Sequence, residues 1–291
     1  MEWYEVLLII IGILLIVFLF FVLPGNPKKA IKHDWLYSTY IAHRGYFNNE
    51  KGIVENTKTA FLLAINKGFN IETDISLTLD NQIVVYHDSD FKRLFNLDKK
   101  ISELTLKEIK ELRYQNSSDE VLEFKEFLDL IDGKTGLLIE FKSQSTKRDI
   151  ILCEKAMEIL KDYKGRYALQ SFQPLIVSYF KKNYPFIPRG QLFMKFNLKE
   201  EVKNARGKGF KGVVGVVTKW MFNNKLTNLI SRPMFIDHSH HNIDFMAKLV
   251  HLFVPLIVYT VVDEESFNRL NKKVDNIIFE NLEIRQNEKL H

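Results

Sequence analysis

The sequence predicts an α/β fold: a (β/α)8 barrel of the TIM type with a small insertion, preceded by one N-terminal transmembrane helix. Short apolar runs typical of strands alternate with segments of helical periodicity along most of the 291 residues. Such alternation is typical of a parallel sheet, and the large number of strand candidates favours closure into a barrel. A long uncharged apolar stretch at the start of the chain indicates the transmembrane helix.

The apolar stretch covers residues 6–23, a length that just spans the hydrocarbon core of a bilayer as a helix. Pro24 and Pro27 close it. A cleaved signal peptide is the competing interpretation. It fits poorly because Glu2 and Glu5 stand where a signal peptide carries positive charge, and no small-residue cleavage site follows. We therefore expect residues 1–27 to be a retained membrane anchor and linker.

The charges flanking this stretch predict its orientation. Lys28, Lys29 and Lys32 follow the span, whereas the residues before it are acidic. Lysines near the end of a span favour the cytoplasmic side of a membrane. The expected location is thus the cell membrane, with a single pass and the following domain in the cytoplasm.

The remaining chain, residues 38–287, is expected to form the barrel domain. Strand candidates are 41–43, 70–75, 83–87, 136–141, 167–171, 190–193, 233–237, 256–262 and 276–279. The clearest helical periodicity lies at 56–67, 105–112, 150–160 and 244–253. One strand is in excess of eight. The step from 75 to 83 has room only for a tight turn at Asp80 and Asn81, so we expect a hairpin-like departure from strict alternation there.

Two segments do not fit the alternation. Residues 89–134 are longer than an ordinary strand-to-helix loop, and we interpret them as a small insertion that forms a lid or rim over the barrel mouth. Residues 207–220, rich in Gly and Val, form an irregular patch that the sequence does not place.

The bulk properties limit the class of partner. A formal net charge of +5 is small for this length, and the lysines are scattered, so the composition does not indicate a nucleic-acid-binding protein. It favours approach to anionic membranes or phosphate-bearing substrates. The single cysteine, Cys153, excludes an intrachain disulfide, and its apolar helical surroundings predict a small core residue.

Candidate functional side chains follow the predicted strands. Glu72 and Asp74 are one residue apart, so on a strand they point to the same face and can bind one hard cation together. Glu140 ends another apolar run. Residues at the C-terminal ends of barrel strands converge at one mouth. His43 and His87, also at strand ends, can transfer protons at neutral pH.

The order of short motifs resembles the glycerophosphodiester phosphodiesterase family. The motifs are H-R-G (43–45), E-N-T (55–57), I-E-T-D (71–74), V-V-Y-H-D (84–88), I-E-F-K (139–142) and Q-S-F (170–172). Two strings depart from the family pattern. Residues 259–262 read Y-T-V-V in place of W-T-V-N, and residues 278–282 read I-F-E-N-L in place of I-T-D-x-P. These differences concern the choice of substrate more than the chemistry.

The resemblance implies a role for each candidate residue. Glu72, Asp74 and Glu140 are expected to bind a divalent metal ion, Mg²⁺ or Ca²⁺, because all three ligands are oxygen donors. His43 and His87 are expected to be the general acid and base. The other expected contacts are substrate and phosphate binding by Arg44, Lys142, Phe172 and Tyr259, with Glu55 as a supporting residue.

Some of these side chains have simpler interpretations. Glu55 either orients Arg44 or belongs to the cap of the following helix. Asp88 is expected to support the site or to form a turn. The cluster 237–241, with the sequence D-H-S-H-H, looks like a transition-metal site, but its nearly consecutive spacing favours a solvated loop.

The expected reaction is metal-dependent hydrolysis of glycerophosphodiesters to glycerol phosphate and an alcohol. One histidine takes the proton of the glycerol hydroxyl as it attacks phosphorus to form a cyclic phosphate, and the other protonates the leaving alcohol. Two alternatives stay open at this stage. The first is a membrane-surface enzyme with lysophospholipase D or phospholipid-headgroup phosphodiesterase activity, for which lysophospholipid is the substrate. The second is a non-catalytic barrel that binds phospholipid.

Overall fold

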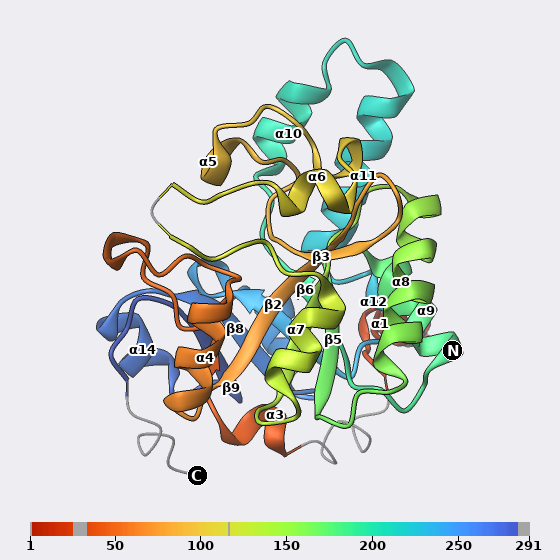
Figure 1. Ribbon diagram of the computed structural model, residues 1–291. Helices are drawn as coiled ribbons and strands as arrows, with labels where there is room; N and C mark the ends of the chain where they lie inside the picture. Colours follow the sequence, from red (N-terminus) through yellow and green to blue (C-terminus); the bar gives the residue numbers. More distant parts are fainter. Residues whose placement is uncertain (1, 26–33, 116, 285–291) are drawn as a thin grey trace.

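A computed structural model of the chain describes residues 2–25, 34–115 and 117–284 (Figure 1). Lys28, Lys29 and Lys32, on which the predicted orientation depends, lie outside these residues. The first element is α1 (Trp3–Val22), a helix long and apolar enough to cross a membrane and almost entirely exposed. By length and composition alone, such a helix is either a membrane span or a signal sequence.

The predicted barrel is confirmed. Its strands are β1 (Ile41–Ala42), β2 (Asn70–Leu77), β3 (Ile83–Val85), β4 (Leu137–Phe141), β5 (Tyr167–Ser171), β6 (Arg189–Phe193), β7 (Phe235–Ser239), β8 (Leu256–Val261) and β9 (Asn276–Phe279). Eight of them pair in parallel, and the β1–β2 pairing closes the ring.

The ninth strand, β3, is the predicted irregularity. It pairs antiparallel with β2, with Ile75 opposite Val85. The turn between the two strands contains Asn81 at a φ of 58°, a left-handed conformation that asparagine tolerates better than most residues. β3 therefore extends the wall of the barrel at the mouth without a helix of its own.

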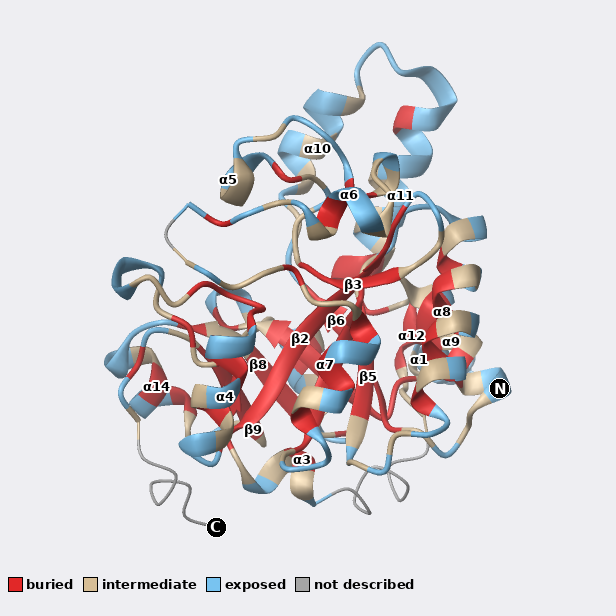
Figure 2. Ribbon diagram, in the orientation of Figure 1, coloured by how far each residue is buried: buried red, intermediate tan, exposed pale blue. Residues whose placement is uncertain are grey.

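Helices surround the barrel, as Figures 1 and 2 show. They are α4 (Lys58–Asn66), α7 (Phe124–Ile131), α8 (Thr146–Leu160), α9 (Pro174–Asn183), α12 (Asn228–Ser231), α13 (Phe245–His251) and α14 (Glu264–Leu270). Most begin at a side-chain cap. The hydroxyl of Thr57 accepts a hydrogen bond from the Ala60 amide and starts α4 two residues later than the periodicity predicts. Cys153, in α8, is buried as expected.

The short helix α3 (Trp35–Ser38) closes the bottom of the barrel. Trp35 and Leu36 pack with Leu138, Phe235 and other interior residues. The contact requires glycine at position 136, because a Cβ there would lie 2.3 Å from the Trp35 ring. With this end of the interior filled, side chains from several strands meet around an open space at the C-terminal ends of the strands.

The segment after β3 divides into two parts. Residues 89–122, here called the rim segment, contain α5 (Lys92–Phe95), the 3₁₀ turn Ile101–Glu103 and α6 (Leu106–Lys110). They pack around a small core of their own that includes Phe91 and Ile109. In contrast, α7 packs on the barrel wall, where Phe127 contacts Phe61 of α4 with ring centroids 4.6 Å apart. The part of the predicted insertion that lies over the mouth therefore ends before α7.

The connection between β6 and β7 contains the patch that the sequence did not place. Residues 209–220 belong to α11 (Gly209–Asn223), which packs against α10 (Leu198–Ala205). Gly212 lies at the contact, and a Cβ there would meet the Ala205 carbonyl oxygen at 2.5 Å. Residues 194–223 thus form a helical hairpin, the α10–α11 hairpin. It stands above the barrel mouth in Figure 1.

Candidate active site

A cavity of about 220 Å³ lies at the mouth of the barrel. Nearly all residues expected to act in catalysis line it: His43, Arg44, Glu72, His87, Glu140, Lys142, Phe172 and Tyr259. They come from strand ends far apart in the sequence, as the convergence of parallel strands predicts. Asp74 is buried behind the cavity wall, where it contacts Lys142. Glu55 does not line the cavity but contacts Arg44, which does.

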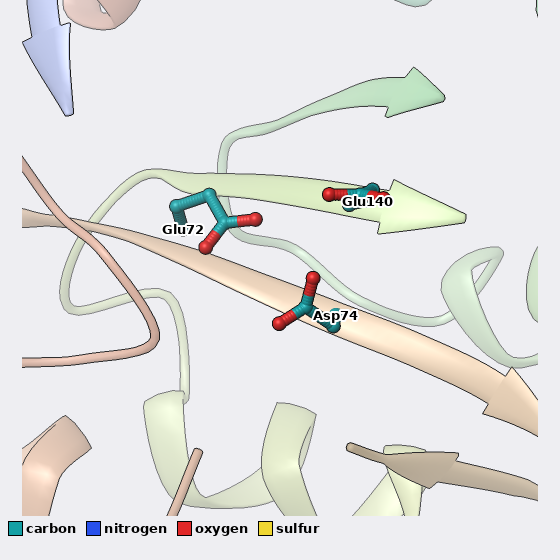
Figure 3. Close-up of side chains that lie close together, drawn as sticks. All are labelled: Glu72, Asp74 and Glu140. Atoms are coloured by element: carbon teal, nitrogen blue, oxygen red, sulfur yellow. The ribbon is translucent and has the colours of Figure 1, made fainter. Parts of the chain in front are cut away.

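Glu72, Asp74 and Glu140 form a compact acidic group (Figure 3). One oxygen of each lies within 4.8 Å of the others, and all three side chains are buried. Two oxygens bound to one Mg²⁺ or Ca²⁺ at 2.0–2.6 Å lie at most about 5 Å apart, so this group fits a divalent cation. The pairing of Asp74 with Glu140 across β2 and β4 sets the spacing.

The charge state of these acids shows why a cation fits. Burial raises the pKa of Glu72 well above its ordinary value, and the charges of Asp74 and Glu140 raise it further. Burial also raises the pKa of Glu140. Burial opposes the ionisation of Asp74 too, but Lys142, His87 and Arg44 together hold its pKa well below the usual range. A bound cation would favour the ionised forms of Glu72 and Glu140, against burial first and the charges of the neighbouring carboxylates second.

His43 is fixed by the barrel itself. Its Nδ1 lies 2.6 Å from a carboxylate oxygen of Glu280, and its Nε2 faces Glu72 at 3.9 Å. Because the carboxylate accepts a hydrogen bond, Nδ1 carries the proton and Nε2 is left free to accept one. Burial lowers the pKa of His43, an effect that Glu280 opposes. Glu280, directly after β9, was not among the predicted site residues.

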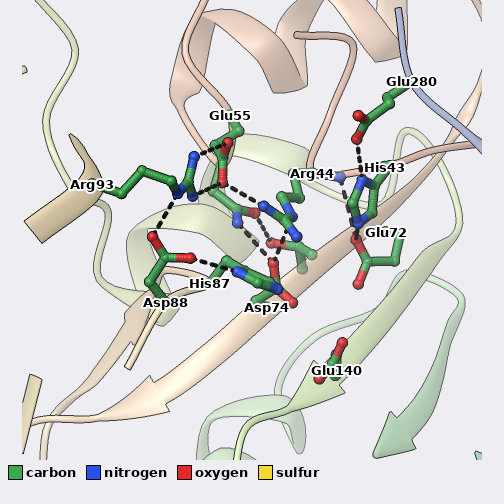
Figure 4. A network of polar contacts seen from close by, with 12 residues as sticks. His43, Arg44, Glu55, Glu72, Asp74, His87, Asp88, Arg93, Glu140 and Glu280 are labelled. Atoms are coloured by element: carbon green, nitrogen blue, oxygen red, sulfur yellow. Dashed lines mark hydrogen bonds and ion pairs between the residues drawn. The ribbon is translucent and has the colours of Figure 1, made fainter. Parts of the chain in front are cut away.

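His87 is held from the rim side (Figure 4). Its Nδ1 lies 2.7 Å from Asp88, and Asp88 accepts a second hydrogen bond from Arg93 Nε at 2.7 Å. Arg93 also donates two hydrogen bonds, of 2.6 and 2.8 Å, to Glu55. Asp88 therefore has the supporting position that was expected of it. Arg93, in α5 of the rim segment, was missed.

Arg44 lies between Glu55 and the acidic group. Its Nη1 donates a 2.6 Å hydrogen bond to Glu55, and its Nε lies 3.5 Å from Asp74. Thus Glu55 contacts Arg44, and the helix cap is provided by Thr57 instead. Asn56, a second missed residue, donates to Asp74 at 2.9 Å and accepts from Thr73. These bonds fix the Asp74 carboxylate.

Lys142 lies on the other side of the acidic group. Its Nζ is 2.9 Å from Asp74 and 2.7 Å from Glu140. Burial lowers the pKa of Lys142, but the two carboxylates outweigh it and the net shift is upward. Lys142 is therefore a cation at the wall of the cavity.

The two aromatic candidates form one wall of the cavity. The rings of Phe172 and Tyr259 meet edge to face with centroids 6.1 Å apart. The Tyr259 hydroxyl donates a 2.9 Å hydrogen bond to the Phe193 carbonyl, which fixes the ring. The wall is apolar toward the cavity and suits a carbon chain more than a charge.

The interpretation of residues 237–241 as a solvated loop is wrong for most of the string. β7 extends to Ser239, so Asp237 and His238 are wholly buried, and His240 is almost so. Burial lowers the pKa of His238 to about 4 and raises that of Asp237 well above its ordinary value. The polar residues of this string suggested a loop, but Asp237 and His238 belong to a strand of a closed barrel whose two faces are both covered. His240 and His241 follow in a 3₁₀ turn, and of the five residues His241 alone is exposed.

The fold and the site define a (β/α)8 barrel with an acidic cation site and two carboxylate-bound histidines at its C-terminal mouth. Residues 43–283 match the model of the glycerophosphoryl diester phosphodiesterase family, and the chain belongs to that family. This range includes every residue of the site described above.

Individual relatives agree with the family. The chain is 32% identical over 167 residues to the glycerophosphodiester phosphodiesterase of Caldanaerobacter subterraneus subsp. tengcongensis, covering 53% of this chain and 65% of that protein. It is 32% identical over 157 residues to the putative glycerophosphodiester phosphodiesterase YhdW of Bacillus subtilis, covering 51% and 63%. The matched part is thus less than two thirds of the length of these relatives.

Solved structures share the fold. A phosphodiesterase of Oleispira antarctica in complex with the product sn-glycerol-3-phosphate superimposes with a TM-score of 0.63 at 19% identity, covering 83% of this chain and 92% of that chain. A glycerophosphodiester phosphodiesterase of Thermotoga maritima gives a TM-score of 0.59 at 24% identity, covering 83% and 93%. At these identities the likeness concerns the barrel architecture alone.

Proposed function

We propose that this protein is a glycerophosphodiester phosphodiesterase, which hydrolyses a glycerophosphodiester to glycerol phosphate and an alcohol. The observation that carries the proposal is the meeting of three buried carboxylates, 4.8 Å or less apart, with two histidines that are each bound through Nδ1 to a carboxylate. The family match supports it. The metal dependence and the roles of the two histidines are part of the proposal.

Glu72, Asp74 and Glu140 would hold Mg²⁺ or Ca²⁺, which when bound supplies Lewis-acid activation of the phosphate and of the attacking hydroxyl. Arg44 and Lys142 flank the same space and offset negative charge on the phosphate oxygens. Phe172 and Tyr259 contact the carbon skeleton of the substrate.

The two histidines differ in a way that assigns their roles. His43 is the more buried, its lowered pKa favours the neutral ring, and its Nε2 is free to accept a proton. It therefore acts as the base toward the glycerol hydroxyl. The His87 side chain is 32% exposed, against 13% for His43, so it is placed to protonate the alcohol that leaves toward solvent. The glycerol oxygen replaces this alcohol on phosphorus and leaves a cyclic phosphate. Water then opens the ring to glycerol phosphate and gives a proton to His87, while His43 returns its proton to the glycerol oxygen.

The test is an assay of the purified full chain with glycerophosphocholine, glycerophosphoglycerol and lysophospholipid, each with chelator, Mg²⁺ or Ca²⁺. Release of glycerol phosphate from a soluble diester, only with a divalent cation, is expected. Circular dichroism confirms that the protein is folded. Failure of folded protein to hydrolyse any diester with either cation contradicts the proposal. Preference for lysophospholipid would favour the lysophospholipase D alternative.

We further propose that α1 is a retained membrane span, with residues 38–287 as a barrel domain in the cytoplasm. Its exposed apolar surface supports the span, and Lys28, Lys29 and Lys32 after it support the orientation. Protease added outside intact cells should spare the barrel. Digestion of the barrel under these conditions would show that the barrel lies outside the cell. Recovery of a chain shortened by residues 1–27 would show that α1 is a signal peptide.

A further inference from the structure

The α10–α11 hairpin differs from the rest of the molecule in its exposure. In Figure 2 the hairpin is mainly pale blue, the colour of exposed residues, and it projects from the mouth end of the barrel. Phe222, near its base, packs against Phe193 and Phe196. Beyond this base the hairpin contributes little to the barrel core, although it contains many apolar side chains.

These apolar side chains lie on one side of α11. Phe210, Val213, Val214, Val217 and Trp220 recur at intervals of three and four residues, which places them in a single stripe along the helix. All are exposed, Phe210 to 82% and Val213 to 57%. The opposite side of α11, with Gly212 and Lys219, faces α10. The stripe is therefore not covered by the hairpin's own partner helix.

The hairpin is also strongly basic. Residues 194–223 contain seven Lys or Arg and two Glu, a net charge of +5, which equals the formal net charge of the whole chain. The charges of all other residues cancel. Lys203, Arg206, Lys208 and Lys211 are exposed around the turn between the helices, and Glu201 is paired with Lys219. An exposed apolar stripe beside exposed cations is typical of a helix that lies in the interface of an anionic bilayer.

The position of the hairpin connects the active site with α1. Met194, at the start of the hairpin, lines the active-site cavity. At the other end, Asn228 follows α11 by five residues and donates a 2.8 Å hydrogen bond to the Val22 carbonyl at the end of α1. Five residues span at most about 17 Å. The end of α1 therefore packs on α12, the helix that follows the hairpin in the chain.

We propose that the α10–α11 hairpin docks on an anionic lipid bilayer and holds the mouth of the barrel at the membrane surface. Charge decides between this partner and a second copy of the chain. Another copy would bring a second +5 segment against the first, whereas an anionic bilayer complements it. The inference rests on the hairpin itself and holds whichever diester the barrel hydrolyses.

The test uses the full chain reconstituted in vesicles and an environment-sensitive fluorophore on an introduced cysteine. The native Cys153 is buried and stays unlabelled. One variant is Val213→Cys in the stripe. The matched control is Leu62→Cys on α4, which is 36% exposed and follows β1, across the ring from the β6–β7 connection. Vesicles contain phosphatidylcholine alone or with phosphatidylglycerol, together with a quencher attached to the lipid chains.

The proposal predicts at least a twofold stronger quenching at position 213 than at position 62 in phosphatidylglycerol vesicles, with weaker quenching in phosphatidylcholine. Lys208→Gln with Lys211→Gln should reduce the quenching at 213. Co-flotation with vesicles shows that α1 still anchors each variant. Equal quenching at both positions, or at 213 in both lipids, overturns the proposal. So does a spectral change at 213 in detergent that grows with protein concentration, because it would report self-association.

Discussion

The two histidines at the barrel mouth have the same kind of partner but different supports. His43 is bound to Glu280, and both residues directly follow adjacent strands of the ring. His87 is bound to Asp88, which depends on Arg93 in the rim segment. The first arrangement is as rigid as the sheet. The second requires that the rim segment pack correctly on the mouth. The comparison shows that one histidine of the proposed acid–base pair is held by the barrel and the other by a segment added to it.

The largest loss of turnover is expected when the carboxylate of Asp74, in the acidic group between the two histidines, is changed. Asp74 contacts Lys142, Arg44 and Asn56, and Asp74→Asn removes its charge with little change of shape. Turnover should be abolished while the fold survives, because ligation and charge are lost but not volume. Steady-state rates measure the turnover, and circular dichroism measures whether the fold survives. An active Asp74→Asn protein would remove the acidic group from the chemistry.

Removal of either histidine tests whether the His43–Glu280 pair and the His87–Asp88 pair are equally needed for turnover. His43→Ala and His87→Ala should each lose roughly two to four orders of magnitude in kcat, the span expected for a positioned acid or base. Steady-state kinetics on a soluble glycerophosphodiester gives the values. A near-wild-type rate in one variant would show that only the other histidine transfers a proton.

Arg93→Ala should act through the two carboxylates that Arg93 holds, Asp88 beside His87 and Glu55 beside Arg44. It removes hydrogen bonds to Asp88 and Glu55, and we expect a loss of about 10- to 100-fold in kcat, as for other partners that orient a functional histidine. The rim segment should also become more sensitive to limited proteolysis. Arg93→Lys keeps the charge but not the planar fork, so it should restore only part of the rate. Full activity of Arg93→Ala would show that His87 is positioned without the rim.

Glu280→Gln should produce the smallest and most specific change. Glu280 raises the pKa of His43 against the lowering effect of burial, so loss of its charge lowers this pKa further. A base must be neutral, and a base with a lower pKa stays neutral to lower pH. The acid limb of the pH–rate profile should therefore move to lower pH. An acid limb that is unchanged, or that moves to higher pH, would show that His43 is not the base.

The sequence predicted most of the barrel and most of the cavity because both depend on local patterns. Apolar runs defined the strands, and short motifs defined Glu72, Asp74 and Glu140. Glu280 and Arg93 were missed for a physical reason. Glu280 contacts His43, 237 residues away in the sequence, and Arg93 joins Asp88 to Glu55, 38 residues away, so both positions depend on how the chain folds. A carboxylate directly after the last strand was the available signal for Glu280.

For residues 237–241 and 207–220, local composition predicted the wrong kind of structure or none. Polar residues suggested a loop for the first, but strand pairing buries Asp237 and His238. Glycines suggested irregular structure for the second, but Gly212 allows two helices to approach closely. Both outcomes depend on contacts with neighbouring elements, which composition does not reveal.

The most direct test of the account is a calorimetric titration of the chelator-treated full chain with Mg²⁺ and Ca²⁺. We predict binding of one divalent cation at the site of Glu72, Asp74 and Glu140. Binding should be lost in Asp74→Asn and retained in His43→Ala, because only the first removes a ligand. Absence of cation binding by the folded protein, or binding that persists unchanged in Asp74→Asn, would contradict the acidic group as the centre of this site.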